Sequence, residues 1–335
     1  MIPGPGIAGM GSFIAPRPPC LRELCVNSCL SPLSIWRHSG SSSTIPPVFA
    51  VPTHRLTVLF FLLPLLSFPV QAQNRPLQTP DTEIVPTGTL RAEIGFDFLQ
   101  DVNFPASGLT GDLTSLGNIE MRLGVGRIVE VQLEGVIQNF LNVKSQVPSL
   151  VMLNLTGANS THDTGDFALY TKILLAAEHK HRPAFAFRFG FQMPNSNQAR
   201  GIGLNTTNVF ASFIVQKHFG QLNTWGEAGL GILQSPGATF SQNDVLIYGG
   251  AFTYPLSHRV TLAGEIAGRY NSRKIDTALL GTESRSEAHL GVQIFAGGFQ
   301  WDLAGLAGLT RRDATSGFTL GVSRDIKLFN LGPKP

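Results

Sequence analysis

The chain has 335 residues, of which 43% are hydrophobic and only 14% charged, with a formal net charge of +3. That small excess comes from residues 1–72, because the remaining 263 residues carry 21 basic and 21 acidic side chains. No basic patch is left that would indicate a nucleic-acid partner. The longest uncharged apolar stretch, 56–70, falls short of the roughly 20 residues that a membrane-spanning helix needs, which excludes a helical membrane protein.

The first 72 residues divide into two segments. Residues 1–53 are rich in proline, glycine and serine and show no sustained periodicity, so we interpret them as an upstream extension that arises from a start codon assigned too early, with initiation near Val51. Residues 54–72 have the layout of a secretory signal peptide: a basic start at His54 and Arg55, an apolar core, and a cleavage site that ends at Ala72. We therefore expect the mature chain to begin at Gln73.

All three cysteines, Cys20, Cys25 and Cys29, precede that cleavage site. A metal site is the alternative for this Cys-x4-Cys-x3-Cys pattern, but only His38 lies near enough to add a ligand. The expected mature chain thus contains no thiol. Its first part, 73–86, holds Pro76, Pro80 and Pro86, and we expect it to form a periplasmic tail.

The rest of the chain alternates apolar with small or polar residues at a period of two. Phe185, Phe187, Phe189 and Phe191 show the pattern most clearly. Successive side chains of a strand point to opposite faces, so such a strand has one apolar face and one face of small or polar residues. Twelve strands are expected, near 88–99, 114–125, 129–138, 165–178, 183–193, 206–218, 222–233, 244–254, 259–270, 286–295, 299–309 and 317–328.

The connections between these segments alternate in length. The even-numbered ones are short, whereas the odd-numbered ones are longer, the longest covering 139–164. Tight periplasmic turns alternating with longer outer loops are typical of bacterial outer-membrane barrels. We therefore predict an all-β fold, a transmembrane antiparallel up-and-down barrel of about twelve strands over 87–329, followed by a tail at 330–335. A soluble β-sandwich is the alternative, although it has no reason to alternate in this way.

Charges mark the face that points inward, because an Arg or Lys side chain at the bilayer midplane costs about 2 to 4 kcal/mol. On the segment 259–270, Glu265 and Arg269 share one face with small residues, and Ile266 and Tyr270 share the other. These interior charges either pack the lumen as ion pairs or line a selective pathway. The candidates for a lumen or selectivity role are Glu93, Glu120, Arg122, Arg188, Glu227, Glu265 and Arg269.

The sequence contains weak signals for catalysis. His289 lies close to Ser284, Ser286 and Glu287, but one strand cannot close a catalytic triad on itself, so we expect no enzyme. The Gly201-Ile202-Gly203 stretch lacks the lysine of a phosphate-binding loop. No cofactor and no metal ion are expected.

Three stretches resemble the outer-membrane barrels of the phenol meta-pathway degradation family, whose members are regarded as transporters. They are TLAGEIAG (261–268), DLAGLAGLT (302–310) and GFTLGVS (317–323). The resemblance covers about 165–329 and places Glu265 at the family's lumen-facing glutamate. It implies a role in moving hydrophobic aromatic molecules and brings no catalytic residue.

Three functions remain open at this stage. The first is a passive channel or uptake barrel for small molecules, apolar or aromatic ones included, and the second is a structural or surface-interaction barrel with a plugged lumen. The third is a barrel hydrolase. We expect a bacterial outer-membrane location, with outer-membrane lipid, the barrel-assembly machinery and a small-molecule solute as partners.

Overall fold

A computed structural model describes residues 75–149, 151–236, 241–273 and 279–329 of the chain. The upstream extension, the signal peptide, the three cysteines and the tail 330–335 lie outside the described residues. Within them, no helix is long and apolar enough to cross a membrane, and a single turn of 3-10 helix, η2, covers Gln198–Arg200. The strands are β1 (Thr89–Phe104), β2 (Leu109–Gly124), β3 (Val129–Gln146), β4 (Ser160–Asp163), β5 (Ala168–Ala176), β6 (Ala184–Gln192), β7 (Asn208–Phe219), β8 (Leu222–Gln234), β9 (Gln242–Pro255), β10 (Val260–Tyr270), β11 (Arg285–Ala296), β12 (Phe299–Gly308) and β13 (Ser316–Lys327).

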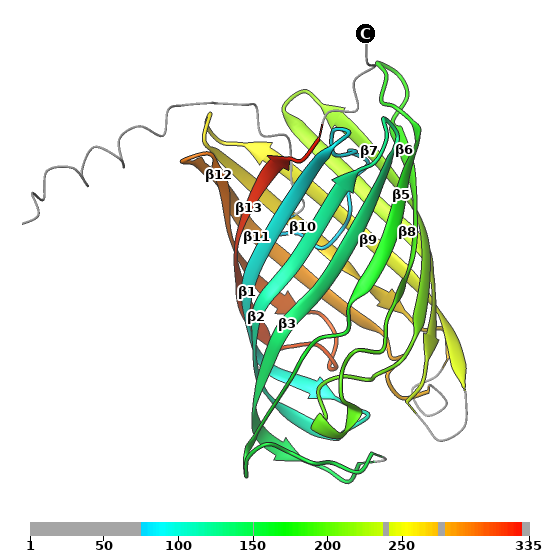
Figure 1. The fold of residues 1–335 in the computed structure, drawn as a ribbon, viewed down its shortest axis with the longest axis vertical. Helices are drawn as coiled ribbons and strands as arrows, with labels where there is room; N and C mark the ends of the chain where they lie inside the picture. The colour runs from blue at the N-terminus through cyan, green and yellow to red at the C-terminus, as the bar shows by residue number, and fades with distance from the viewer. Residues whose placement is uncertain (1–74, 150, 237–240, 274–278, 330–335) are drawn as a thin grey trace, which may run out of the picture. The chain divides into compact units, whose positions relative to one another are not determined.

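These strands form one closed barrel (Figure 1). Each strand pairs antiparallel with its neighbour in the chain, and β1 closes the ring by pairing with β13, Thr89 opposite Lys327. The short β4 pairs only with the far end of β3, so the wall itself has twelve strands. A closed ring leaves no unpaired strand edge in lipid, where water cannot satisfy backbone groups. The predicted fold, a twelve-stranded antiparallel barrel, is confirmed.

Within the described residues, the predicted connections agree with the structure except for the first and the third. The first connection was expected at 100–113, but β1 and β2 continue to a four-residue turn at 105–108. Two β-bulges explain the difference: Gly117, with φ +69°, adds a residue to β2, and an extra residue enters β1 between Leu99 and Val102. Each extra residue inverts the side-chain alternation, so the period-two pattern breaks while the ladder continues. Strand β3 likewise runs to Gln146, into the segment 139–164 that was expected to be a loop.

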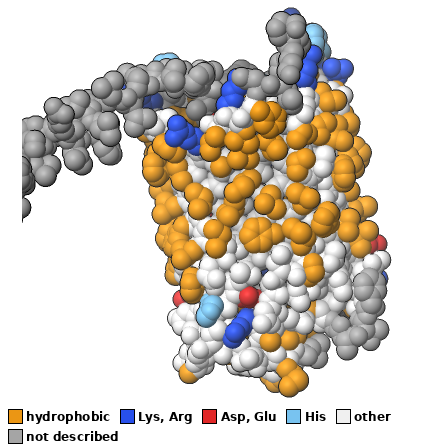
Figure 2. All heavy atoms as spheres, viewed as in Figure 1, with side chains coloured by type: hydrophobic (Ala, Val, Ile, Leu, Met, Phe, Trp, Pro, Cys, Tyr) orange, Lys and Arg blue, Asp and Glu red, His pale blue; other side chains and the backbone are white. Residues whose placement is uncertain are grey.

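The outer surface of the wall is apolar. Phe213 on β7, Leu230 on β8 and Leu290 on β11 expose 57%, 60% and 61% of their area, and their chain neighbours point inward. Figure 2 shows this hydrophobic surface as a belt on the barrel wall, which gives way to polar residues toward the end that carries the long loops. An apolar band flanked by polar ends is the surface that a bilayer requires of a barrel.

The interior is polar and closely packed. Arg122 and Lys172 have no exposed area, and Gln132, Gln216 and Gln293 are almost as deeply buried. Buried polar groups of this kind need internal partners, because an unpaired group costs about 1 to 3 kcal/mol.

Substitution of Phe213 tests the assignment of the two faces. We expect Phe213→Arg to cost the barrel about 2 to 4 kcal/mol, since it places a cation on the lipid-facing wall. Phe213→Ala, the matched control, loses only apolar contact with Phe187, whose ring centroid lies 5.0 Å away. The measurement is the fraction of folded protein after refolding into lipid, read from heat-modifiable migration on a gel. Equal loss in both variants would contradict the assignment.

Candidate functional site

The lumen contains the N-terminal part of the described chain. Residues 75–86 fold back from the start of β1 into the barrel, and Leu77, Thr79, Thr82 and Val85 each expose less than 5% of their area there. We call residues 75–86 the plug segment. The sequence analysis placed 73–86 in a periplasmic tail, and for the described residues 75–86 that prediction is wrong.

Glu265 on β10 holds the centre of the plug segment. Its carboxylate accepts hydrogen bonds from the Gln78 amide at 2.6 Å, the Thr79 amide at 2.8 Å and the Thr79 hydroxyl at 2.7 Å. His289 Nδ1 on β11 lies 3.1 Å from the same carboxylate. On the opposite side of Thr79, its carbonyl accepts a bond of 2.9 Å from the indole nitrogen of Trp225. The carboxylate therefore satisfies two backbone amides that have no strand partner of their own.

A buried charge cluster holds the next part. The carboxylate of Asp81 lies 3.0 Å from Lys172 Nζ and 3.9 Å from Arg122 Nη1. Arg122 also pairs with Glu93 at 2.8 Å and Glu120 at 3.1 Å. Buried cations require such partners, because a lone buried charge is far more costly than a paired one. Asp81 thus binds the plug segment to the wall and supplies part of the negative charge that Arg122 and Lys172 require.

The last part of the plug segment is bound to the wall as well. Thr82 donates to Gln216 Oε1 through its amide at 2.9 Å and its hydroxyl at 2.7 Å. Further along, the Val85 amide donates to Glu130 at 2.7 Å. Between them lies Glu83, whose pKa is raised to about 7 by burial, with the charge of Asp81 adding to the effect.

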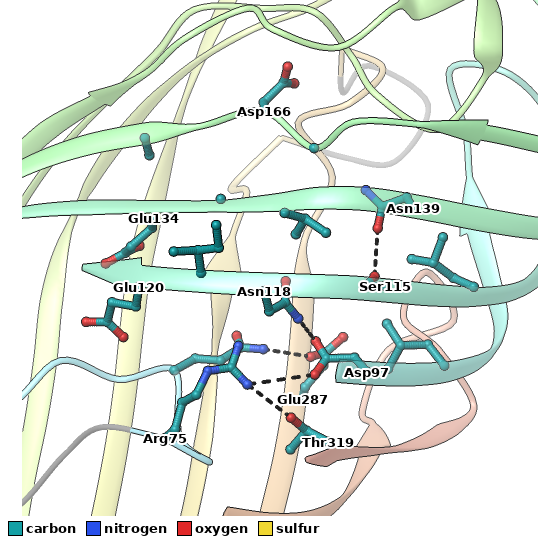
Figure 3. A pocket seen from close by; sticks show the side chains of 18 of the residues that line it. Arg75, Asp97, Ser115, Asn118, Glu120, Glu134, Asn139, Asp166, Glu287 and Thr319 are labelled. Carbon is teal, nitrogen blue, oxygen red and sulfur yellow. Dashed lines mark hydrogen bonds and ion pairs between the residues drawn. The ribbon is translucent and has the colours of Figure 1, made fainter. Parts of the chain in front are cut away.

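Arg75 is the first described residue and projects into a cavity of the lumen (Figure 3). Its guanidinium lies 4.0 Å from Asp97 on β1 and donates to the Thr319 hydroxyl on β13 at 3.3 Å. Asn118 on β2 donates to the same Asp97. The contacts span three neighbouring strands, including the β1–β13 seam that closes the barrel.

The cavity that Arg75 enters has a volume of about 680 Å³ and lies between the plug segment and the long loops. Its lining mixes carboxylates, such as Glu120, Glu134 and Asp166, with apolar side chains such as Leu113 and Leu306. Two smaller cavities of about 450 and 310 Å³ share lining residues with it, among them Leu99 and Glu287. Together they form a set of adjoining spaces in the half of the lumen nearer the loops.

Two loops fold over this half of the barrel. The segment between β3 and β5 and the segment 193–207 bond to each other, since the Asn154 amide donates to the Ala199 carbonyl at 2.7 Å. Ser107, in the first turn, donates to the Gly201 carbonyl at 2.6 Å. Beneath them, Leu109, Leu113 and Leu141 form an apolar cluster. The cavities are thus bounded by the loops at one end and the plug segment at the other.

The structure brings all seven sequence candidates to the interior side of the wall. Glu93, Glu120 and Arg122 form the charge cluster, and Glu265 binds the plug segment. Arg188 pairs with Glu134 and stacks on the Tyr170 ring at 3.6 Å, and Glu227 accepts from Ser212 at 2.5 Å. Arg269 faces inward four residues from Glu265, yet it bonds to the carbonyls of Glu283 and Gly281 instead.

The residues that sequence reasoning missed are those of the plug segment itself. Arg75, Thr79, Asp81 and Thr82 all bond to the wall, but they follow no strand period. One available signal was the set of three prolines, which lack an amide hydrogen and so reduce the number of donors that a buried irregular segment must satisfy. His289, considered earlier for a triad, contacts Glu265, Glu287 and the Pro76 carbonyl. Among the described residues, no group of three or more His, Cys, Asp or Glu side chains is arranged to hold a metal ion.

Comparison with known proteins supports the fold. No family model matches the sequence, and no curated protein matches it. Among solved structures, an outer-membrane channel from Pseudomonas putida F1 is 13% identical, covers 75% of this chain and 100% of its own, and superposes with a TM-score of 0.55. The porin NanC, 10% identical over 70% of this chain and 98% of its own, gives a TM-score of 0.42.

The likeness to the Pseudomonas channel shows a shared barrel fold. The closed twelve-stranded wall and its apolar belt give the chain the architecture of a bacterial outer-membrane barrel. The protein is therefore located in the bacterial outer membrane.

Removal of Glu265 tests how firmly the plug segment is held. We expect Glu265→Ala to destabilise the barrel by about 3 to 5 kcal/mol, because it orphans two amides, a hydroxyl and His289. The matched control is Glu227→Ala, which removes a lumen carboxylate that bonds to the wall residue Ser212. The measurements are thermal unfolding in detergent and protease cleavage within residues 75–86. Similar unfolding temperatures and cleavage in both variants would contradict a plug-holding role.

Proposed function

We propose that the chain is an outer-membrane channel for the uptake of small molecules, apolar or aromatic ones included. The observation that carries this proposal is the set of adjoining cavities inside the lumen. A barrel packed only for stability has no need of a space of about 680 Å³ inside its lumen. The mixed lining of carboxylates and apolar side chains suits a path for solutes with a polar group and an apolar body.

We also propose membership of the phenol meta-pathway degradation family. The three stretches that carry the resemblance fall on β10, on β12 with the two residues after it, and on β13. Glu265 takes the lumen-facing position that the resemblance assigns to it. In this proposal, the carboxylate that the resemblance singles out holds the plug segment.

The plug segment is the proposed gate. It lies across the lumen between the cavities and the end where β1 begins, so a solute has to pass beside it or displace it. Lumen charges such as Glu120 and Arg188 would then act on solutes that reach the cavities, as charged rings do in selective pores. Outer-membrane lipid and the barrel-assembly machinery are the proposed partners of the wall.

A structural barrel with a permanently plugged lumen is the second candidate. The bonds of Glu265, Lys172 and Gln216 to the plug segment favour it, because each holds that segment against the wall. Single-channel recording on refolded mature protein separates the two functions. Discrete openings support the channel, and a membrane that stays silent at all voltages supports the plugged barrel.

A removable tether tests the gate directly. A side chain at Gly249 on β9 would place its Cβ 3.1 Å from Cβ of Thr79, so a shift of a few tenths of an ångström in the plug segment brings the pair to the roughly 3.5 to 4.5 Å of a disulfide. The described residues contain no cysteine, so Thr79→Cys combined with Gly249→Cys introduces one defined pair. We expect oxidation to reduce conductance at least several-fold and a reductant to restore it, since the disulfide fixes the plug segment to the wall. The single variant Thr79→Cys is the control for effects of the oxidant. Unchanged conductance in the cross-linked double variant would contradict the gating role.

A further inference from the structure

Arg269 on β10 and Arg285 on β11 lie directly opposite each other in the strand register. Both line the cavity of about 450 Å³ and the adjoining cavity of about 310 Å³. The smaller of these also touches the turn after β1 and the loop 193–207, so the two arginines lie between the loop end of the barrel and the plug segment. A solute that enters from the loop end would reach them before it reaches the plug segment.

The hydrogen bonds of this pair go to neutral oxygens. Arg269 donates to the Glu283 carbonyl at 2.9 Å and the Gly281 carbonyl at 3.0 Å, and Arg285 donates to the Asn103 carbonyl at 2.8 Å. Other lumen arginines differ, since Arg122 and Arg188 pair with carboxylates. Across the described ranges, no carboxylate oxygen comes within 4.0 Å of a guanidinium nitrogen of Arg269 or Arg285.

The nearby acids are held by other donors. Glu287 lines both cavities, but its carboxylate lies 3.5 Å from His289 Nε2 and accepts a hydrogen bond of 3.4 Å from the side-chain amide of Gln78. The Glu283 carboxylate accepts from the Gly281 amide at 3.0 Å, and Asp313 accepts from the Ser286 amide at 2.9 Å. Two fixed positive charges therefore face the cavities without a bound counter-charge from the wall.

Apolar side chains share the lining of these cavities with the two arginines. Phe210 and Ile247 line the larger cavity together with polar residues such as Ser212 and Glu227, and Ile247 is the partner of Arg269 in the register of β9 and β10. Leu99 lines both cavities. Guanidinium groups bind carboxylates through charge-assisted, often paired hydrogen bonds. An apolar wall beside such donors favours an anion whose remaining body is hydrophobic.

We propose that Arg269 and Arg285 bind the carboxylate of a small organic anion whose apolar or aromatic body lies against Phe210, Ile247 and Leu99. This inference rests on the proposed channel function and specifies its substrate class. The pair concentrates such anions at the loop side of the plug segment, as a focused positive potential does in other clefts.

Equilibrium binding of benzoate to the refolded mature barrel in detergent, followed by calorimetry, tests the proposal. Benzamide, which has the same ring without the charge, is the ligand control. We expect benzoate to bind more tightly than benzamide, and Arg269→Gln and Arg285→Gln each to weaken benzoate about tenfold, the loss of one charged hydrogen-bonding group. The double variant should abolish measurable binding.

Arg311→Gln is the matched protein control, because Arg311 is an exposed arginine in the loop between β12 and β13. It should leave benzoate binding unchanged. Heat-modifiable migration confirms that each variant is folded, and a variant that fails to fold is replaced by the conservative Arg269→Lys or Arg285→Lys, for which partial weakening is expected. Benzoate binding that is equal in all folded variants, or matched by benzamide, would overturn the proposal. Inorganic phosphate that binds as tightly as benzoate and is lost in the same variants would also overturn it, since the apolar wall would then contribute nothing.

Conductance in potassium chloride separates this inference from the proposed function. Binding needs no passage through the barrel, so a silent membrane with intact benzoate binding would remove the channel and keep the anion site. Discrete openings in a barrel that does not bind benzoate would remove the anion site and keep the channel.

Discussion

The absence of hydrogen-bonding partners in lipid is the constraint on which the rest of this structure depends. It requires every backbone group at membrane depth to be paired within the protein, and the ring closed by β1 and β13 meets that requirement. It also requires charged side chains to point into the lumen. Once they are buried there, neither lipid nor water can provide their hydrogen-bonding partners. The interior then has to supply its own partners. Arg122 and Lys172, with no exposed area, show how far this goes, since each is bounded by several carboxylates.

The plug segment takes part in the same balance. Asp81 brings a negative charge to Arg122 and Lys172, and the amides of Gln78 and Thr79 satisfy Glu265. The wall and the segment are thus complementary: the wall supplies the Glu265 carboxylate and the Arg122 and Lys172 cations, and the segment supplies backbone amides and the Asp81 carboxylate. This complementarity stops short of Arg269 and Arg285, whose partners are carbonyl oxygens. The lumen therefore contains one region where buried cations pair with carboxylates, around Arg122 and Lys172, and one region where they do not, around Arg269 and Arg285.

The sequence predicts the wall far better than its contents. Side chains such as Phe187 and Phe213 repeat at a period of two because lipid lies on one side of every strand. This repetition locates nine of the twelve wall strands to within three residues at both ends, all except β1, β2 and β3. The ends of β1 and β2 are harder to predict, since a bulge beside Leu99 inverts the alternation without ending the ladder. Sequence also assigns the lumen face of Glu265 and Arg269 correctly, from the cost of charge in lipid.

What those lumen residues bind could not be predicted in the same way. Glu265 and Arg269 are four residues apart on one face, which suggested a pair, yet one bonds to residues 186 and 187 positions earlier in the chain and the other to the loop that follows its own strand. The plug segment has no periodicity because it follows neither a strand nor a helix. Its position is set by individual bonds to side chains from β3, β5, β7, β8 and β10, and no local pattern records such contacts.

Gly88 joins these two parts of the molecule at a single point. Its amide donates to the Gly124 carbonyl at the end of β2 at 2.8 Å, and its carbonyl accepts from the Leu328 amide just beyond β13 at 2.9 Å. The residue has φ +77°, and a Cβ there would lie 2.1 Å from the Phe329 carbonyl oxygen. Only one residue, Thr87, separates it from Pro86 at the end of the plug segment. The chain therefore turns inward at the same place where its first and last strands meet. The closure of the ring and the entry of the chain into the lumen therefore share one anchoring residue, and a side chain at Gly88 would disturb both at once.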